Sequence, residues 1–372
     1  MTGSSLIKLL VSNALYYTGI VGPSKRQYRD KFLILTYHRV LANHGSEQPY
    51  FRDGMFITPE AFEMQLKYLT RNANIRPLRE VLTRMENKEN FEPATVVLTF
   101  DDGYIDNYTI AFPLLKKYGV TATIFLTTDP LDTGTPLPWD SLASKISFLW
   151  DSKGPQAFTN SPLRKYLSGI EKADKIRFST YVVDEMNALQ RRERETFWNE
   201  LESWLESEST PAPENPMMTW DMVKEMAAYG IDFENHTVHH KLVDELRDEE
   251  LEEEIRPGSH RIREVLQQPA DVIAYPRGKT LSPSKDAYIR EHFRAAMSTV
   301  SGFNTHETDK YELYRKDANF LLLQKKFFPA YFEADVCGFW DRIRHFKNKA
   351  QALSLKTLRG ADDMLNTYGS AF

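Results

Sequence analysis

Short apolar runs alternate with amphipathic segments along most of the chain, and this alternation limits the fold more than any other feature of the sequence. Runs rich in β-branched and aromatic residues predict buried strands, and segments with apolar residues at helical spacing predict the helices between them. Strands are expected at 31–40, 95–100, 121–127, 230–233, 272–275 and 295–299, with helices at 58–72, through 114–119, and at 219–229, 249–267 and 284–292. Strand, helix and strand at this spacing indicate parallel β-structure with crossover helices.

Two kinds of segment depart from the alternation. Residues 140–215 are rich in charged residues and helix formers and end in the turn-prone PAPENP, which predicts a helical insertion. Residues 1–30 predict a short amphipathic helix, and 321–372 are aromatic, basic and helical in pattern. We therefore expect a domain at 31–320 that carries the insertion, with a helical extension at each end.

Composition and the two ends of the chain indicate which partners and which compartment to expect. The 372 residues carry 47 basic and 52 acidic side chains, so a net charge of −5 gives no reason to expect nucleic acid as a partner. The single cysteine, Cys337, excludes an internal disulfide framework and fits a reducing compartment. The N-terminus lacks a secretory pattern, so a cytoplasmic location is expected. The apolar 6–20 segment and the basic 339–359 segment predict either docked helices or peripheral attachment to a membrane.

Adjacent carboxylates follow the clearest strand. Asp101 and Asp102 come directly after the strand at 95–100, at the carboxyl end where parallel β/α folds place their active sites. Two unpaired charges buried side by side are costly, and a cation bound by one of them removes most of that cost. An Asp-Gly turn is the alternative explanation of this pair alone.

Histidines cluster in the segment 234–240. His236 and His240, four residues apart, can converge on one metal if the segment turns helically, and His239 is a competing ligand. Together with one aspartate they give a set of two histidines and one carboxylate, which leaves coordination positions open for water and substrate. Surface or core histidines are the alternative.

At these motifs the chain resembles the polysaccharide deacetylase family, carbohydrate esterase family 4, which shares the NodB homology domain. Thr99–Gly103 (TFDDG) resembles the family's first motif, His236–His240 (HTVHH) its second, and Ala274–Gly278 (AYPRG) its third. Supporting similarity lies in Tyr37–Val40, Thr58–Asn72 and Thr219–Asp221. The resemblance spans about 31–320 and implies a distorted (β/α)7 barrel.

The resemblance also implies roles for these residues. Asp101 corresponds to the general base, and Asp102, His236 and His240 correspond to ligands of one divalent metal, with zinc expected and cobalt or nickel as alternatives. The backbone N–H of Arg277 is expected to stabilise the oxyanion.

The third and last motifs differ from the common pattern. Ala274 stands where an arginine is usual, Arg277 stands where an aromatic residue is usual, and Tyr311–Arg315 lacks the late histidine that serves as the general acid. These departures resemble a subgroup linked to exopolysaccharide synthesis. His38 becomes a candidate acid and Arg315 a candidate for orienting the aspartate. Further substrate-binding candidates are Trp139, Tyr275 and Pro276.

The expected function is removal of N-acetyl groups from a glycan during surface or exopolysaccharide synthesis. The substrate is either a polymer or a lipid-linked precursor. Two alternatives remain: a metal-dependent O-acetyl esterase or non-sugar amidohydrolase, and a carbohydrate-binding relative with little catalysis. The sequence does not indicate an oligomeric state.

Overall fold

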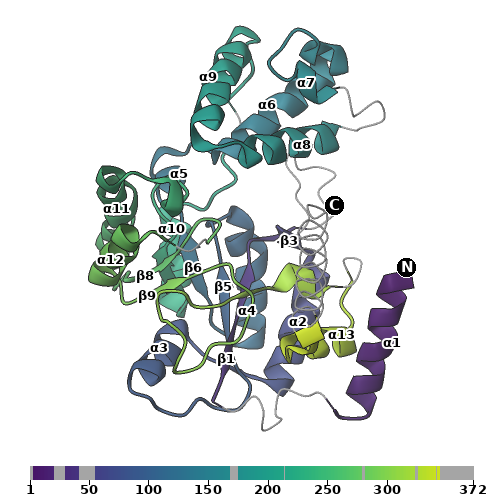
Figure 1. The fold of residues 1–372 in the computed structure, drawn as a ribbon, viewed down its shortest axis with the longest axis vertical. Helices are drawn as coiled ribbons and strands as arrows, with labels where there is room; N and C mark the ends of the chain where they lie inside the picture. The colour runs from purple at the N-terminus through teal and green to yellow at the C-terminus, as the bar shows by residue number, and fades with distance from the viewer. Residues whose placement is uncertain are drawn as a thin grey trace, which may run out of the picture.

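Buried apolar strands assemble into one curled parallel sheet at the centre of the protein (Figure 1). The computed structural model describes residues 3–20, 30–41, 55–167, 175–212, 214–278, 281–322, 326–340 and 342–343. The strands lie in the order β10-β1-β5-β6-β7-β8-β9, and a short β4 also pairs with β5. Their bounds are β1 (Phe32–Tyr37), β4 (Asn74–Ile75), β5 (Thr95–Phe100), β6 (Thr123–Leu126), β7 (Asp232–Asn235), β8 (Val272–Ala274), β9 (Ala295–Met297) and β10 (Lys316–Asp317). The sheet confirms the predicted incomplete, distorted (β/α)7 barrel.

The two central strands explain why the sheet forms. Every residue of β1 and of β5 is buried, as expected for parallel strands covered on both faces. They pair in parallel from Phe32 with Thr95 to Tyr37 with Phe100. This register brings the carboxyl ends of both strands to the same edge of the sheet.

Helices cover the sheet between successive strands. Their bounds are α2 (Pro59–Asn72), α3 (Leu78–Glu86), α4 (Phe112–Tyr118), α5 (Asp129–Thr133), α10 (Trp220–Tyr229), α11 (Asp248–Leu266) and α12 (Pro283–His292). Local sequence sets several of their ends. The hydroxyls of Thr58 and Thr219 accept hydrogen bonds from the first turns of α2 and α10, and Gly230 ends α10 in a left-handed conformation with φ +105°.

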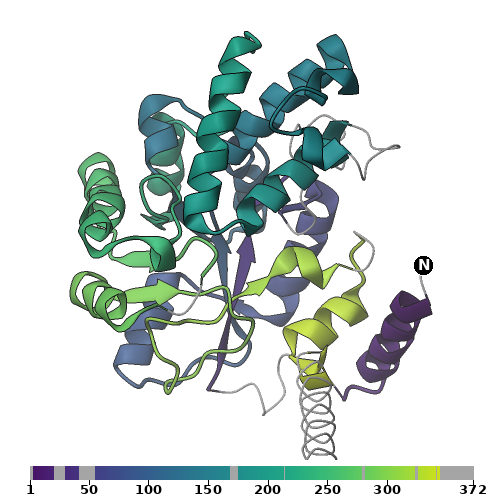
Figure 2. The same cartoon turned by 45° about the horizontal axis from the view of Figure 1, so that its top comes forward.

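The insertion is helical, as predicted, and forms a separate body above the barrel (Figures 1 and 2). It comprises α6 (Pro138–Lys153), α7 (Arg164–Leu167), α8 (Lys175–Ala188) and α9 (Arg191–Ser207). Its apolar residues pack into a core of their own, which includes Leu149, Phe158, Phe178 and Leu201. This core is separate from those of the sheet, and the insertion meets the barrel through apolar packing around Trp139 and through polar contacts that are described below.

The terminal segments differ in how much of them is described. Helix α1 (Gly3–Tyr17) lies beside α13 (Pro329–Val336), as both views show (Figures 1 and 2). Among the helices of the described residues, none is long and apolar enough to cross a membrane. Most of the predicted basic C-terminal helix lies outside the described residues.

A buried ion pair ties the residues just after β1 to the segment that follows β5. The Nε of Arg39 donates to Oδ2 of Asp106 at 2.9 Å, and the backbone N–H of Val40 donates to Oδ1 at 2.6 Å. Both charged side chains are almost fully buried. Removing one partner would leave the other charge without compensation in a water-poor environment.

We therefore expect Arg39→Met to lower the free energy of unfolding by about 3–5 kcal/mol, measured by urea denaturation. The double variant Arg39→Met/Asp106→Leu should recover much of this loss because no charge stays buried alone. Lys224→Met, which breaks an exposed pair with Asp221, is the control and should cost no more than about 1 kcal/mol. Equal losses in the single and double variants would contradict the assignment.

Candidate metal centre

The carboxyl ends of the strands open into a cleft with a volume of about 650 Å³. Of the candidate residues from the sequence, Pro276 and the competing ligand His239 do not line it. The others that line it are His38, Asp101, Asp102, Trp139, His236, His240, Tyr275, Arg277 and Arg315. The first and last of these residues, His38 and Arg315, are more than 270 positions apart in the sequence. The parallel pairing of the strands brings them together.

A sharp backbone turn follows β5. Asp102 has φ +76° and Gly103 has φ +92°, so both lie in the left-handed region. A Cβ on Gly103 would also lie 2.8 Å from Cδ2 of Leu126, so any other residue would clash as well as strain the backbone. The turn lets Asp101 and Asp102, both nearly fully buried, contact different partners.

Asp102 faces the two histidines. Its Oδ1 lies 3.4 Å from Nε2 of His236 and 3.3 Å from Nε2 of His240. Burial alone would raise the pKa of Asp102, but the two imidazoles outweigh it and hold the pKa well below its ordinary value. Within the described part of the chain, neither oxygen of this carboxylate accepts a hydrogen bond.

These distances fit a metal ion. Tetrahedral zinc sites have ligand distances of about 2.0–2.2 Å, which separates their ligand atoms by about 3.3–3.5 Å. The two measured separations agree with that spacing, and a cation would satisfy the buried carboxylate oxygens. Asp102, His236 and His240 can therefore hold a metal ion together.

The histidine segment differs from the sequence expectation in one respect. A helical turn was expected to bring His236 and His240 together, but residues 236–240 are not helical. Thr237 has φ +69° and His240 has φ +59°, and these left-handed residues fold the segment back on itself. The side chain of Asn235 supports the turn, because its Oδ1 accepts a hydrogen bond from the N–H of Thr237 at 2.7 Å.

Helix α11 holds this turn in place. The Nδ2 of Asn235 donates to the carbonyl of Ile255 at 2.7 Å and to Oγ of Ser259 at 2.8 Å. Gly258 leaves room for it, since a Cβ there would lie 2.8 Å from the Oδ1 of Asn235. Sequence reasoning missed these supporting residues. The available signal was Pro257-Gly258, because these two weak helix formers are unusual inside a helix.

His239 does not belong to the cluster. Its Nδ1 lies 2.9 Å from Oε2 of Glu254, and about half of its side chain is exposed. Glu254 also accepts the backbone N–H of His239 at 2.7 Å. Its contacts therefore tie the segment to α11 rather than completing a metal site.

A backbone carbonyl orients His236. The Nδ1 of His236 lies 2.8 Å from the carbonyl oxygen of Ala274, so Nδ1 is the nitrogen that donates to this oxygen and Nε2 faces Asp102. Metal-binding histidines are commonly oriented in this way. Ala274 therefore contributes through its main chain, although its side chain differs from the usual arginine.

Asp101 contacts a buried arginine. The Nη1 of Arg315 donates to Oδ1 of Asp101 at 2.7 Å and to the hydroxyl of Thr36 at 2.9 Å, and its Nε donates to the carbonyl of Ser298 at 2.9 Å. Burial raises the pKa of Asp101, but the guanidinium of Arg315 and other nearby charges outweigh it and hold the pKa below its ordinary value. Asp101 is thus an ionised carboxylate in a fixed orientation.

His38 lies beside the other oxygen of Asp101. Its Nε2 is 3.9 Å from Oδ2 of Asp101, and its side chain is about one fifth exposed at the cleft. Its Nδ1 is buried without a hydrogen bond in the described structure.

An aromatic residue packs on the other ligand. The ring of Trp139 meets that of His240 edge-on, with centroids 4.6 Å apart. Its Nε1 donates to the hydroxyl of Tyr104 at 2.9 Å, and that hydroxyl donates to Asp140 at 2.9 Å. Trp139 is therefore fixed by hydrogen bonds as well as by packing. Burial raises the pKa of Asp140 to about 7.

The third motif contributes two side chains to the cleft. The hydroxyl of Tyr275 donates to the carbonyl of Tyr311 at 3.0 Å. Arg277 has φ +56°, and its Nη1 donates to the carbonyl of Asn187 in the insertion at 3.1 Å. Arg277 thus connects the barrel to the insertion, a contact that the sequence did not predict.

Known proteins share both the motifs and the fold. A family model described as polysaccharide deacetylase matches residues 88–147 and 169–295, and the gap between them falls within the insertion. YxkH of Bacillus subtilis, which is named as a polysaccharide deacetylase, is 22% identical over 287 residues, covering 77% of this chain and 70% of its own length. A poly-β-1,6-N-acetyl-D-glucosamine N-deacetylase of Staphylococcus aureus is 34% identical over 115 residues, which are 28% of this chain and 39% of that protein.

A solved structure agrees at the level of the fold. The Streptococcus pyogenes deacetylase PplD, determined in complex with acetate, superimposes with a TM-score of 0.51 and 20% sequence identity over 78% of this chain and 96% of that chain. The family match covers half of the present chain and includes both Asp101-Asp102 and the histidine segment. On these grounds the chain belongs to the polysaccharide deacetylase family.

Proposed function

We propose that this protein hydrolyses the amide bond of N-acetyl groups on a glycan that is used in surface or exopolysaccharide synthesis. One observation carries the proposal: three ligand atoms at metal-binding distances lie beside a second, separately held carboxylate at the same cleft. A hydrolase needs both parts, because one activates the carbonyl and the water and the other moves the proton. The name of the Staphylococcus aureus relative supports an N-acetylated glycan as the substrate.

Asp102, His236 and His240 would hold one divalent cation, with zinc proposed and cobalt or nickel as alternatives. Two imidazoles and one carboxylate are typical of hydrolytic zinc sites with an open position. When bound, such a cation supplies Lewis acidity toward the acetyl carbonyl and lowers the pKa of water.

Asp101 is the proposed general base. Arg315 engages Oδ1, which fixes the carboxylate and keeps it ionised, so Oδ2 is directed toward His38 and the cleft. Oδ2 would accept one proton from the attacking water as the new carbon–oxygen bond forms. A carboxylate held in this way does not need to reorient before it reacts.

His38 is the proposed general acid. When the carbon–nitrogen bond breaks, the departing nitrogen must gain a proton to leave as an amine, and His38 lies next to the base that has just taken one. The backbone N–H of Arg277 is the proposed donor to the oxyanion. The products are acetate and a free amino sugar.

Two alternatives share the same site. An O-acetyl esterase would release acetate and leave a hydroxyl, which requires less assistance from an acid because an alkoxide leaves more easily than an amide nitrogen. A carbohydrate-binding relative would bind glycan without turnover. The structured environment of Asp101 favours catalysis, since binding alone does not require an oriented base.

We expect metal-stripped protein to release acetate from N-acetylglucosamine oligomers only after zinc, cobalt or nickel is restored. Asp101→Asn should lower kcat by about 10²–10⁴-fold because it removes proton transfer while keeping the side-chain shape. Enzyme-coupled detection of acetate provides the measurement, with metal content determined for each sample.

Metal content is the control, because Asp101→Asn should still bind one ion per chain. Release from O-acetyl esters without release from N-acetyl oligomers would favour the esterase alternative. Stoichiometric metal with no turnover of either substrate would count against an enzyme.

The support from α11 leads to a second expectation. Asn235→Ala removes the side chain that shapes the histidine turn without touching a ligand atom. We expect metal affinity to fall by about 10–100-fold, as is typical when an outer partner of a metal site is lost. Competition with a chromophoric chelator would measure it. Asn199→Ala is the matched control on the insertion, and unchanged affinity in Asn235→Ala would reject the assignment.

Attachment to an anionic membrane surface is a further part of the proposal. Helix α1 exposes large apolar side chains on the face turned away from α13, including Leu6, Ile7, Leu10 and Tyr17. Its packed face includes Leu9 and Leu15, which meet apolar residues near α13, and Ser12, which accepts a hydrogen bond from Trp340. Residues 1–29 include four basic side chains and no acidic one, which favours anionic lipid. The cytoplasmic location itself stays a prediction.

We expect the protein to float with vesicles of phosphatidylcholine and phosphatidylglycerol at low salt. Ile7→Glu/Leu10→Glu, at exposed positions that leave the α13 contact intact, should reduce the bound fraction at least tenfold. Equal flotation of both proteins would contradict the role of α1. Dimerisation in the absence of lipid that the same variant abolishes would instead identify the face as a contact between two copies.

A further inference from the structure

A second cleft continues the first beneath the insertion. It has a volume of about 600 Å³ and lies between α8 and α9 on one side and the histidine segment and α11 on the other. Each cleft falls within the range of about 300–1,000 Å³ that is common for ligand sites. The two share four lining residues, Trp139, Asn187, His240 and Arg277. The two clefts are therefore adjacent and together form what we call the groove, with His240 of the candidate metal centre lining both of them.

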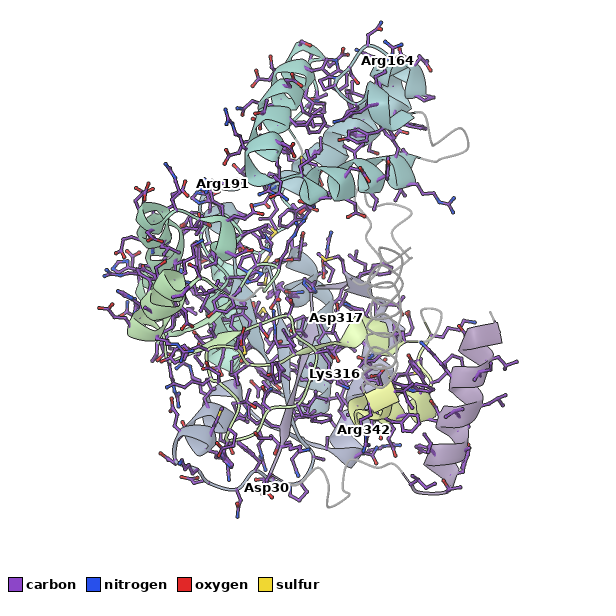
Figure 3. All side chains as sticks on the ribbon, in the orientation of Figure 1. Asp30, Arg164, Arg191, Lys316, Asp317 and Arg342 are labelled. Carbon is purple, nitrogen blue, oxygen red and sulfur yellow. The ribbon has the colours of Figure 1, made fainter. Side chains whose placement is uncertain are left out.

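Charged contacts fix the insertion over this groove. Arg191 at the start of α9 donates to both carboxylate oxygens of Glu250, at 2.8 and 2.7 Å, and to the carbonyl of Glu245 at 2.6 Å. Arg194 pairs with the side chain of Glu245. Arg191 lies where the insertion meets the barrel (Figure 3). Bidentate arginine pairs of this kind are geometrically specific, so the outer wall of the groove has a defined position.

The lining of the second cleft suits a sugar ring. Trp198 and Met186 from the insertion and Leu242 from the barrel provide apolar surface, and Asn187 and Asn199 provide amide groups. Several of its charges are already paired, as in Arg191 with Glu250 and Arg194 with Glu245. A cleft of this kind favours a neutral ligand with apolar ring faces and many hydroxyl groups over a polyanion.

We propose that the second cleft binds the sugar units next to the one that is deacetylated, and that Trp198 is its principal contact. The inference rests on the proposed function for the identity of the ligand. Because the second cleft adjoins the candidate metal centre at His240, the preferred substrate is an oligomer or polymer rather than a single N-acetylated sugar. The insertion thereby determines specificity for chain length.

The test compares single N-acetylglucosamine with its oligomers of two to six units, in both β-1,4 and β-1,6 linkage, on the zinc-loaded full chain. In the wild type, kcat/KM should rise at least tenfold from the single sugar to the longer oligomers. Trp198→Ala should reduce the ratio of kcat/KM for the hexamer to that for the single sugar about tenfold. Asn199→Ala, at an exposed position on the same wall, should reduce it by a smaller factor.

Trp204→Ala is the matched control. Trp204 lies on the same helix and packs against the same insertion core, but it does not line the groove. It should leave the ratio unchanged, which separates a binding effect from a loosened insertion. A wild-type kcat/KM that is independent of length overturns the inference. So does a Trp198→Ala ratio equal to that of the wild type or of Trp204→Ala.

Binding separates this inference from the proposed function. Calorimetric titration of zinc-loaded Asp101→Asn with the hexamers should show affinity that Trp198→Ala lowers about tenfold and Trp204→Ala does not. If no variant releases acetate but this pattern of binding holds, the deacetylase proposal fails and the glycan site stands. If acetate is released without dependence on length or on Trp198, the proposed function stands and the subsite is wrong.

Discussion

Two carboxylates buried next to each other, Asp101 and Asp102, impose the constraint that the rest of the site satisfies. Water cannot stabilise their charges, so each must find a compensating partner in the protein or its ligand. Asp101 finds Arg315, and Asp102 faces two imidazoles at the spacing of metal ligands. The two carboxylates are therefore compensated by different groups, and this difference allows them to have different roles. A guanidinium fixes the carboxylate of the proposed base, while the other carboxylate is left able to bind a cation.

The turn at 236–240 depends on residues that lie outside the cleft. Left-handed residues are uncommon outside glycine, and they persist where surrounding contacts determine them. Here Asn235 bonds to Thr237 on one side and to α11 on the other, and Gly258 makes the close approach possible. A helix on the outside of the barrel therefore positions ligands inside it. The two elements are adjacent because the crossover that follows β7 returns along the same face of the sheet.

The insertion reaches this centre through Trp139, which packs on His240. Its core is separate from that of the barrel, so its sequence can vary in the interior without disturbing the metal ligands. Arg191, Arg194 and Arg277 fix its position through ion pairs and backbone carbonyls. Arg277 is notable because the family resemblance assigned its main chain to the oxyanion, whereas its side chain reaches the insertion. One residue of the third motif thus links the proposed chemistry to the second cleft.

The sequence alone determined the alternation of strands and helices, the helical nature of the insertion and the residues of two motifs, Asp101-Asp102 and His236 with His240, because these depend on local spacing and residue type. It missed β4 and β10, because a strand of two residues is too short to show any periodicity. It also assigned a helical turn to 236–240. Only the tertiary structure decided which of three neighbouring histidines face Asp102, which partner holds Asp101, and that the insertion forms one wall of a second cleft. These depend on contacts between residues far apart in the chain, and such contacts leave no periodic signal in the sequence.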